Sequence, residues 1–326
     1  MEKVGNVLMK QLGVGVIGVG FWGQNHARVY KELKKTKLVG ISDLDKRKAE
    51  ITAQTYQCDF FEKNEDLLEN EEIDAVSICT PTSSHLKVSF QAIEYGKHLL
   101  VEKPLGRTLK EAIRVVKEAE KNKIILTVGH IERFNPAVQK LKEMIQKKIL
   151  GDIILIFSRR VTRWPERVGD VGVVMDSAIH DIDVMMYLLE TDIDRVYAKI
   201  GNLKHKFEDY AEALLHFKNG IVGFLDANWL TPRKIRRLIL TGSEATTTLD
   251  YIEQLINIEN SKGMRTIQSK WEEPLKLELD RFADIVLKDM SPSVAGLDAL
   301  KAIQVCEGIL KSGLSGKEVR LNKITI

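Results

Sequence analysis

Short apolar, β-branched runs alternate with longer amphipathic segments through the first 130 residues. Such runs are typical of buried strands, and segments with apolar positions three and four apart are typical of helices. Strands separated by helices need crossover connections, so the pattern predicts a parallel sheet covered by helices on both faces. The expected strands cover residues 12–17, 37–43, 74–79, 98–101 and 124–128, and the expected helices 24–33, 46–55, 83–94 and 109–121.

The pattern changes after Gly129, where longer alternating runs follow one another. The pair Asn219-Gly220 between two such runs predicts a hairpin with a type I′ turn. We expect an α+β arrangement with a largely antiparallel, open-faced sheet and helices on one face. The helices are expected at 135–147, 173–190 and 294–310, and the strands at 152–160, 195–206, 211–217, 221–228 and 234–241. The fold class is therefore α/β, with predicted domains at 1–129 and 130–326.

Composition narrows the function classes. The 326 residues include 49 basic and 46 acidic side chains, interspersed along the chain, for a net charge of +3. This balance argues against nucleic-acid or membrane partners, which need clustered basic residues. No apolar run reaches the roughly 20 residues that cross a bilayer, and no signal peptide precedes the first strand, so we expect a cytoplasmic protein. The three cysteines form no disulfide framework and no Cys-x-x-Cys metal motif.

A glycine motif joins the first expected strand to the first expected helix. In Gly18–Gly23, Gly18 permits a tight turn, Gly20 lets the backbone approach a pyrophosphate, and Gly23 allows close helix–strand packing. The helix N-terminus presents free N–H groups to that anion. The first domain is therefore predicted to be a Rossmann dinucleotide-binding domain, with Phe21 and Trp22 among the cofactor contacts.

Asp43 closes the second expected strand, 20 residues beyond Gly23. An acid at this place accepts hydrogen bonds from the adenosine ribose hydroxyls and repels the extra phosphate of NADP. The predicted cofactor is therefore NAD rather than NADP, although Lys46 and Arg47 follow closely and weaken that discrimination.

Two further segments carry candidate chemistry. Lys103, in Glu102-Lys103-Pro104, follows the strand at 98–101 and so lies at the carboxyl edge of the sheet, although a surface lysine fits the same position. Asp176 and His180 stand four residues apart, on one face of a helix. Alcohol oxidation needs a base for the hydroxyl proton, which lysine or histidine supplies. Alternatively, Asp176 and His180 are only a surface pair on the helix, or His180 is a buried histidine hydrogen-bonded by its neighbours. A metal site would need a third ligand, and none stands at a recognisable spacing.

Together these features resemble the Gfo/Idh/MocA family of oxidoreductases. The resemblance spans nearly the whole chain and is carried by the following residues: Gly18 to Gly23, Thr80-Pro81 with His85, Glu102-Lys103-Pro104, and Asp176 with His180. It implies that Lys103 and His180 serve proton transfer and that Asp176 positions the substrate. It also implies that Thr80, Pro81 and His85 line the nicotinamide side of the cofactor site, with Glu102 and Lys103 beside them. Members pair their open sheets, so a homodimer or homotetramer is expected.

Within that family, residues 129–136 and 172–183 resemble the enzymes that oxidise the C3 hydroxyl of UDP-N-acetylglucosamine, whose 3-keto product an aminotransferase consumes. Relatives acting on the uronate form carry Asn in place of Asp176, which favours the neutral sugar. A diphosphate is bound best by guanidinium groups, which donate two parallel hydrogen bonds. We therefore expect Arg163 or Arg133 to bind the diphosphate and Trp164 to pack on the sugar or base. Alternatively, these arginines only balance Glu166 and Asp170.

Two other functions fit the same residues. An inositol or free-sugar dehydrogenase would use Lys103 and His180 on an uncharged polyol, with little dependence on the arginines. A non-enzymatic sensor or co-regulator loaded with NAD is the second alternative. The presence of both Lys103 and His180 argues against a sensor, which does not need a proton-transfer pair.

Overall fold

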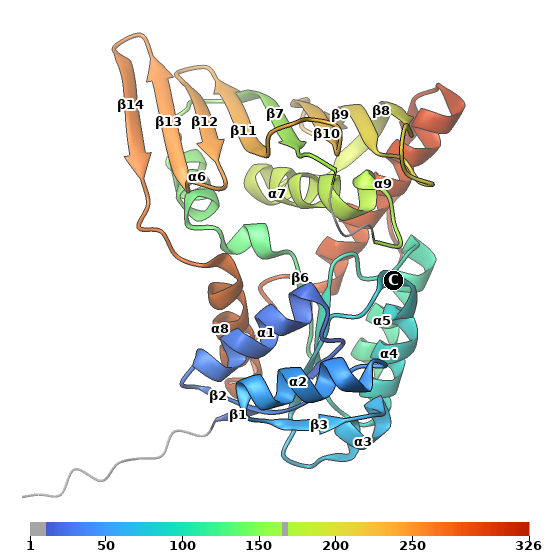
Figure 1. Ribbon diagram of the computed structural model, residues 1–326. Coiled ribbons are helices and arrows are strands. Elements are labelled where there is room, and N and C mark those ends of the chain that lie inside the picture. Colours follow the sequence, from blue (N-terminus) through green and yellow to red (C-terminus); the bar gives the residue numbers. More distant parts are fainter. Residues whose placement is uncertain (1–10, 165–168, 326) are drawn as a thin grey trace, which may run out of the picture.

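A computed structural model of the chain describes residues 11–164 and 169–325 (Figure 1). Two sheets form two layers, one above the other in the view of Figure 1, with helices beside and between them. No described helix is long and apolar enough to cross a membrane.

The lower layer is the predicted parallel sheet, with strand order β3-β2-β1-β4-β5-β6. β1 and β4 are buried at every residue, as expected for strands covered on both faces. The order reverses between β1 and β4, and at such a point the carboxyl ends of the strands leave a crevice for a ligand. The elements are β1 (Leu12–Ile17), α1 (Phe21–Glu32), β2 (Thr36–Ser42), α2 (Lys46–Tyr56), β3 (Asp59–Phe61), α3 (Asn64–Glu69), β4 (Ala75–Ile78), α4 (Thr82–Glu94), β5 (His98–Glu102), α5 (Leu109–Lys121) and β6 (Leu126–Gly129).

The upper layer is a nine-stranded sheet with strand order β14-β13-β12-β11-β7-β10-β9-β8-β15. Its strands pair antiparallel except β7 and β10, which are parallel, so the prediction of a largely antiparallel sheet is confirmed. The strands are β7 (Ile153–Val161), β8 (Ile193–Gly201), β9 (Tyr210–Phe217), β10 (Val222–Asn228), β11 (Ile235–Gly242), β12 (Thr246–Asp250), β13 (Leu255–Asn260), β14 (Gly263–Gln268) and β15 (Val319–Arg320).

Helices cover one face of this sheet, the face turned toward the lower layer (Figure 1). No other part of the described chain covers the opposite face of the sheet. The apolar side chains of Tyr197, Leu214 and Phe224 are exposed on it. The helical elements are η1 (Ile131–Phe134), α6 (Pro136–Gln146), η2 (Val174–Ala178), α7 (Ile179–Leu189), α8 (Pro274–Leu287) and α9 (Gly296–Ser315).

The hairpin between β9 and β10 forms as predicted, but its turn differs. Gly220 has a φ of +88°, whereas Asn219 is not among the described residues with positive φ. A type I′ turn needs positive φ at both central residues. Here Gly220 N donates to Phe217 O at 2.9 Å, and only the glycine adopts the left-handed conformation. The type I′ prediction is therefore wrong, because the extra residue in the loop moves the left-handed position to Gly220 alone.

The segment between residues 242 and 293, for which the sequence pattern predicted no element, completes both layers. β12 to β14 extend the upper sheet, whereas α8 returns to the lower layer and packs against α1 and β1. Leu275, Leu279 and Phe282 of α8 are buried in one cluster with the side chains of β1 and α1. Part of the chain beyond residue 129 therefore belongs to the packing of the first half.

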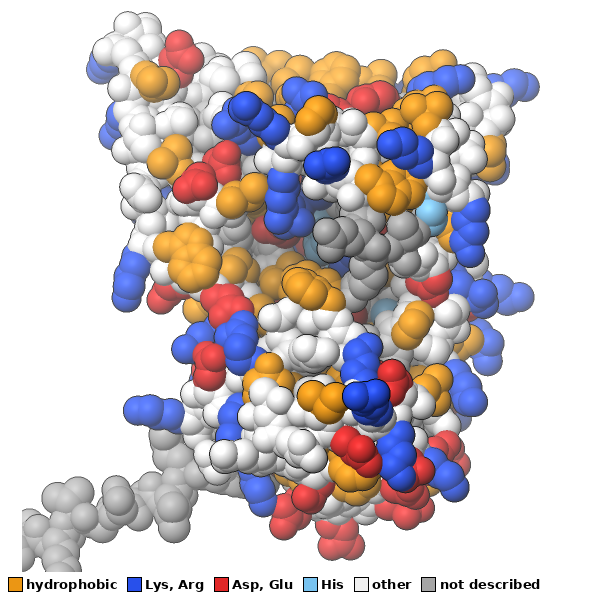
Figure 2. Space-filling model, in the orientation of Figure 1, with side chains coloured by type: hydrophobic (Ala, Val, Ile, Leu, Met, Phe, Trp, Pro, Cys, Tyr) orange, Lys and Arg blue, Asp and Glu red, His pale blue; other side chains and the backbone are white. Residues whose placement is uncertain are grey.

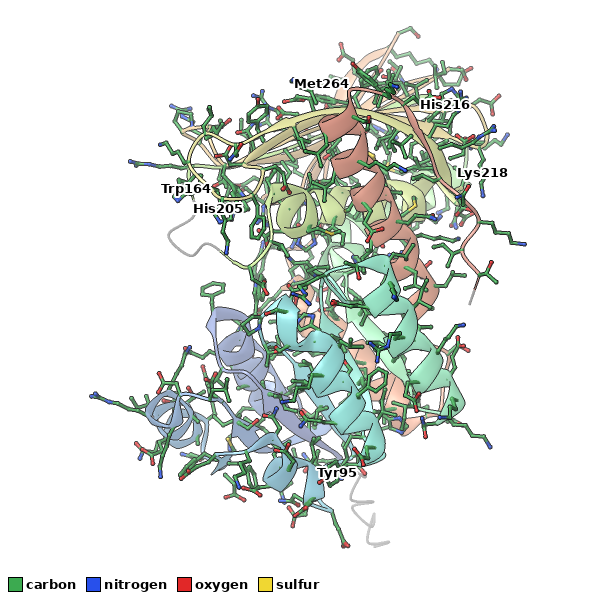
Figure 3. All side chains as sticks on the ribbon, turned by 90° about the vertical axis from the view of Figure 1, so that its right-hand side faces the viewer. Tyr95, Trp164, His205, His216, Lys218 and Met264 are labelled. Carbon is green, nitrogen blue, oxygen red and sulfur yellow. The ribbon has the colours of Figure 1, made fainter. Side chains whose placement is uncertain are left out.

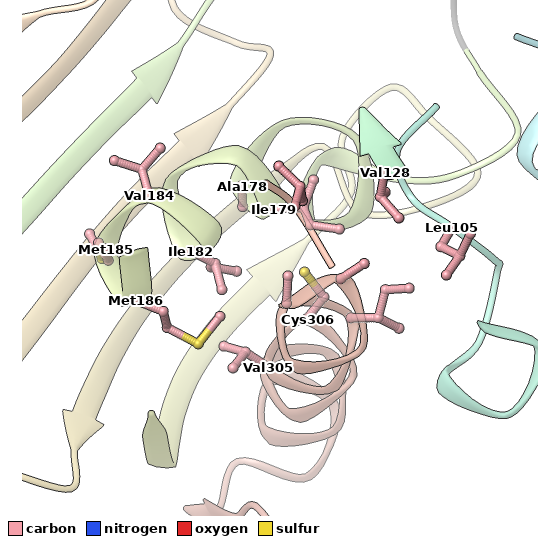
Figure 4. Close-up of a cluster of buried hydrophobic side chains, with 14 of the residues drawn as sticks. Leu105, Val128, Ala178, Ile179, Ile182, Val184, Met185, Met186, Val305 and Cys306 are labelled. Atoms are coloured by element: carbon pink, nitrogen blue, oxygen red, sulfur yellow. The ribbon is translucent and has the colours of Figure 1, made fainter. Parts of the chain in front are cut away.

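One continuous apolar core joins the two layers. Ile182 and Met186 of α7 lie near Val305 and Cys306 of α9, and Val128 of β6 belongs to the same buried cluster (Figure 4). A shared core of this kind resists relative motion of the layers, because separating them would expose apolar surface at roughly 25 cal/mol per Å². Side chains contributed by both layers are therefore held at fixed distances.

Candidate active site

The glycine loop forms a cradle at the carboxyl end of β1. Gly18 has a φ of +88°, and a Cβ added there would lie 2.8 Å from Thr80 Cγ2. A Cβ on Gly23 would collide with the carbonyl oxygen of Gly18. Gly20, the N-cap of α1, has no side chain to cap the helix, so the first N–H groups of α1 are left for a ligand or water. This backbone shape fits a dinucleotide pyrophosphate.

Asp43 lies beside this loop, at the end of β2. Its carboxylate accepts hydrogen bonds from Val19 N at 2.7 Å and from Asp45 N at 2.9 Å. The side chain stays partly exposed. The carboxylate is thus fixed next to the cradle, and its contact with a ribose stays a prediction.

The loop that follows β4 forms the next part of the wall. Thr80 is half-buried and Pro81 exposed, whereas His85 is buried in α4. The ring nitrogens of His85 lie 2.8 Å from Pro104 O and 2.9 Å from Thr80 O. Burial lowers the pKa of His85 and outweighs the two carbonyls, which act to raise it. His85 therefore ties the β4 loop to the turn after β5, and the contact of Thr80, Pro81 and His85 with a nicotinamide stays a prediction.

Glu102 supports the same turn from behind. His26 of α1 donates to Glu102 Oε1 at 3.1 Å, and Lys103 N donates to Glu102 Oε2 at 3.2 Å. Burial alone would raise the pKa of Glu102, but the hydrogen bond and charge of His26 hold it below its ordinary value. The carboxylate is buried and lies behind the turn that carries Lys103. No motif indicated His26 as its partner.

Lys103 reaches from the lower layer to the upper one. Its Nζ donates to Asp176 O at 2.7 Å and to Asp176 Oδ1 at 3.0 Å. The Lys103 side chain is 8% exposed, whereas that of Asp176 is 48% exposed. The peptide between Lys103 and Pro104 is cis. Residues 73 positions apart in the sequence are therefore joined at one end of the crevice.

Asp176 lies in a π-helical turn, which corrects the prediction of one α-helix over 173–190. η2 is a π-helix, and regular α-helix begins only at Ile179. The wider turn accommodates an extra residue, a feature that often accompanies functional sites. The Asp176 carbonyl in this turn accepts the bond from Lys103, so the local distortion provides one of the contacts of the lysine.

His180 follows at the start of α7. Its Nδ1 is buried and makes no hydrogen bond to any described residue. Burial holds the pKa of His180 well below its ordinary value, and the positive charges of Lys103, Arg160 and Arg236 lower it further. The imidazole is therefore neutral at neutral pH and able to accept a proton.

An aromatic cluster lies next to Asp176. The rings of Trp164 and Trp229 meet edge to face at 6.0 Å, and His205 contacts both, at 5.9 and 5.7 Å. Trp164 and His205 lie together at one end of the upper layer (Figure 3). Trp229 Nε1 donates to Ser177 Oγ at 3.2 Å, and Ser177 Oγ donates to Asp176 Oδ2 at 3.3 Å. Trp164 thus belongs to a group that is hydrogen-bonded to the predicted site.

Arg133 does not join this group, which corrects its prediction as a diphosphate clamp. Its guanidinium donates to both oxygens of Asp183, at 2.8 and 2.6 Å, and to Asp298 at 3.1 Å. It also lies over the ring of Tyr187 and is only 7% exposed. Two carboxylates take three of its five N–H donors and the guanidinium is buried, so it has no exposed fork to offer a phosphate. Arg163 is exposed after β7, and its role stays a prediction.

Figure 2 shows a hollow between the two layers in which basic, acidic and histidine side chains are visible. The cradle, the Lys103–Asp176 pair and His180 come from the layers on either side of it. Together they place a backbone site for a dinucleotide beside a proton acceptor and a positioned lysine, an arrangement suited to removing a hydride and a proton from an alcohol.

Comparison with known proteins agrees with this chemistry. Residues 12–130 match the model of an oxidoreductase family with an NAD-binding Rossmann fold, and residues 138–248 match the Gfo/Idh/MocA C-terminal domain. The chain belongs to the Gfo/Idh/MocA family. It is accordingly an NAD-binding oxidoreductase, as the glycine cradle independently indicates.

Two relatives and two solved structures illustrate the range of proteins to which the chain is similar. UDP-N-acetylglucosamine 3-dehydrogenase from Acidithiobacillus ferrooxidans is 28% identical, with 95% of each chain covered. The NAD⁺-dependent scyllo-inositol 2-dehydrogenase of Bacillus subtilis is 30% identical, covering 96% of this chain and 97% of the relative. A solved structure of the Acidithiobacillus enzyme covers 93% of this chain and 98% of its own, with a TM-score of 0.86 and 26% identity. The levoglucosan dehydrogenase complex with NADH and levoglucosan, at 21% identity and a TM-score of 0.90, shares the fold.

Proposed function

We propose that the protein oxidises the C3 hydroxyl of UDP-N-acetylglucosamine to the 3-keto sugar, with NAD as hydride acceptor. The observation that carries the proposal is the contact of Lys103 with Asp176 beside a neutral His180, at the end of the cofactor crevice. The UDP-N-acetylglucosamine 3-dehydrogenase match over 95% of both chains supports the substrate.

In this mechanism His180 accepts the hydroxyl proton, because its imidazole is held neutral. The Lys103 ammonium has three N–H donors and directs two of them to Asp176. The third donates to the hydroxyl oxygen and stabilises the negative charge that develops as the proton leaves. NAD held in the cradle of Gly18 to Gly23 would supply the hydride acceptor for the same carbon. The alcohol thereby loses one proton and one hydride and becomes a ketone.

The partly exposed rings of Trp164 and His205, packed against the buried Trp229, support a sugar or base at this place. Faces of aromatic rings pack against the apolar C–H surface of a sugar, and stacking on a base contributes about 1–3 kcal/mol. The hydrogen bonds through Ser177 join that packing surface to Asp176. The same ring group therefore aligns the substrate with Lys103.

An inositol or free-sugar dehydrogenase is the second candidate. The 30% identity with the scyllo-inositol enzyme over nearly the whole chain favours it. It predicts turnover without any phosphate on the substrate.

Reduced nicotinamide formation separates the two candidates. Absorbance at about 340 nm would be followed with NAD, UDP-N-acetylglucosamine, scyllo- and myo-inositol and free hexoses, with an aminotransferase present to remove the ketone. A rise with the UDP-sugar alone supports the first proposal. A rise with inositol and none with the UDP-sugar replaces it with the second.

The open face of the upper sheet supports a homodimer or homotetramer as a further part of the proposal. Tyr197, Leu214 and Phe224 are 50%, 39% and 40% exposed on neighbouring strands. Pairing of two such faces would remove this apolar surface from water. Phe224→Glu should reduce the mass measured by light scattering to that of a monomer, and an unchanged mass would locate the contact elsewhere.

A further inference from the structure

Three basic side chains share the helix-covered face of the upper sheet. Arg160 of β7 pairs directly with Arg236 of β11 across the antiparallel ladder. Directly paired residues point to the same side of a sheet, and so do residues two apart in an extended chain. Lys234, just before β11, therefore extends this basic row toward the end of the sheet.

The three cations are not equally paired. Arg160 is buried and bonded to Asp181 and Glu132, the latter at 3.0 Å. Arg236 reaches the same Glu132 oxygen only at 3.5 Å, so it shares a carboxylate that Arg160 already uses. Lys234 makes no ion pair with any residue in the described ranges.

The row reaches the reacting centre. Arg236 is among the positive charges that lower the pKa of His180, and Asp176 is among the charges that act on Arg236. The charge of Arg236 is the largest cause that lowers the pKa of Lys234, ahead of burial. Two like charges held this close repel one another, and an anion bound between them relieves the repulsion.

A count of the charges supports the same point. Among the residues that the structure describes, the cations that meet here are Lys103, Arg160, Arg236 and Lys234, and the carboxylates that face them are Glu132, Asp176 and Asp181. Asp176 is engaged by Lys103, and Asp181 by Arg160. The unbalanced positive charge therefore falls on Arg236 and Lys234, which lie toward the open end of the row.

We propose that Arg236 and Lys234 form a subsite for an anionic group of the substrate, one sugar unit away from the reacting hydroxyl. The inference rests on the proposed function and gives it the cationic pair that Arg133 does not supply. The guanidinium of Arg236 provides a fork that matches phosphate or carboxylate oxygens, and Lys234 adds a mobile point charge. The anion is the diphosphate of a nucleotide sugar or the carboxylate of a sugar acid.

The test measures anion binding separately from turnover. Calorimetry would give the dissociation constants of UDP and of glucuronate for the NAD-loaded wild type and for Arg236→Gln, Lys234→Gln and the control Arg265→Gln. Arg265 is exposed on the edge strand β14, far from the row in the sheet order. We expect UDP to bind about tenfold more weakly to each of the first two variants and unchanged to the control.

Each outcome decides the proposal. If only glucuronate binding weakens, the subsite stands and its anion is a carboxylate. If neither anion binds the wild type, or both bind all variants equally, the subsite is wrong. Lys234→Gln alters an exposed side chain, so its result stands even where Arg236→Gln disturbs Glu132. If UDP binds through these residues but no sugar gives NADH, the proposed reaction is wrong and the subsite stands. If the UDP-sugar gives NADH but UDP binding does not depend on these residues, the reaction stands and the subsite is wrong.

Discussion

Lys103 of the lower layer gives two of its three N–H donors to a single residue of the upper layer, Asp176. One bond goes to the carboxylate and the other to the backbone carbonyl in the π-helical turn, so both the side chain and the main chain of Asp176 orient the lysine. Lys103 is thereby oriented by an element that only the folded chain brings near it.

Replacing Lys103 with Met should lower kcat by about 10²- to 10⁴-fold, because the positioned donor at the hydroxyl oxygen is lost. NAD binding should persist, since the glycine cradle does not depend on this side chain. Steady-state kinetics and a fluorescence titration with NAD would measure the two quantities. Turnover at the wild-type rate would remove Lys103 from the mechanism.

The pH dependence of the rate should follow His180. Its pKa in the fold lies well below the ordinary value of about 6.5. The neutral, proton-accepting form therefore persists through neutral pH, and kcat/KM should fall only when the pH drops below that usual range. Arg236→Gln removes a positive neighbour and should move this acid limb to higher pH. An acid limb at the same pH in both proteins would assign it to another group.

Trp229→Phe should lower kcat about tenfold while the protein stays folded. The substitution keeps an aromatic side chain, though a smaller one, and removes the indole N–H that holds Ser177 and, through it, Asp176. Trp271→Phe is the matched control, because Trp271 is 61% exposed and outside the cluster. Equal kinetics of the two variants would show that the bond to Ser177 does not position Asp176.

Glu278 on α8 should make stability depend on pH. Its carboxyl is fully buried, neither oxygen has a hydrogen-bond partner among the described residues, and burial raises its pKa well above the ordinary value. The folded state keeps the proton, whereas the unfolded chain releases it above about pH 4.3. The wild type should therefore lose stability as the pH rises from that value.

Glu278→Gln has no such proton to release. Urea denaturation would measure the free energy of unfolding of both proteins. The difference, variant minus wild type, should increase by at least about 1 kcal/mol from pH 5 to pH 8. A difference that stays constant over this range would mean that Glu278 ionises in the fold as it does in the unfolded chain.

Local sequence was enough to predict the parallel sheet and its cradle. Gly18 and Gly23 must be glycine because a Cβ at either would meet atoms a few residues away or at the end of the adjacent strand. The alternation of strands and helices requires the crossover connections. The motif around Lys103 and the spacing of Asp176 and His180 likewise predicted residues that the fold brings together. These signals survive because they depend on short-range geometry.

Only the tertiary structure decided which charges are free. Arg133 and Arg236 are both arginines in polar segments, and nothing in their neighbours along the chain distinguishes them. Arg133 is neutralised by Asp183 and Asp298, which lie 50 and 165 residues away, whereas Arg236 meets a carboxylate already taken by Arg160. Pairing of charges depends on distance in space, and the electrostatic energy of a buried group is set by its partners rather than by its sequence. The position of α8 over the first half, and the π-helical turn at Asp176, follow from packing for the same reason.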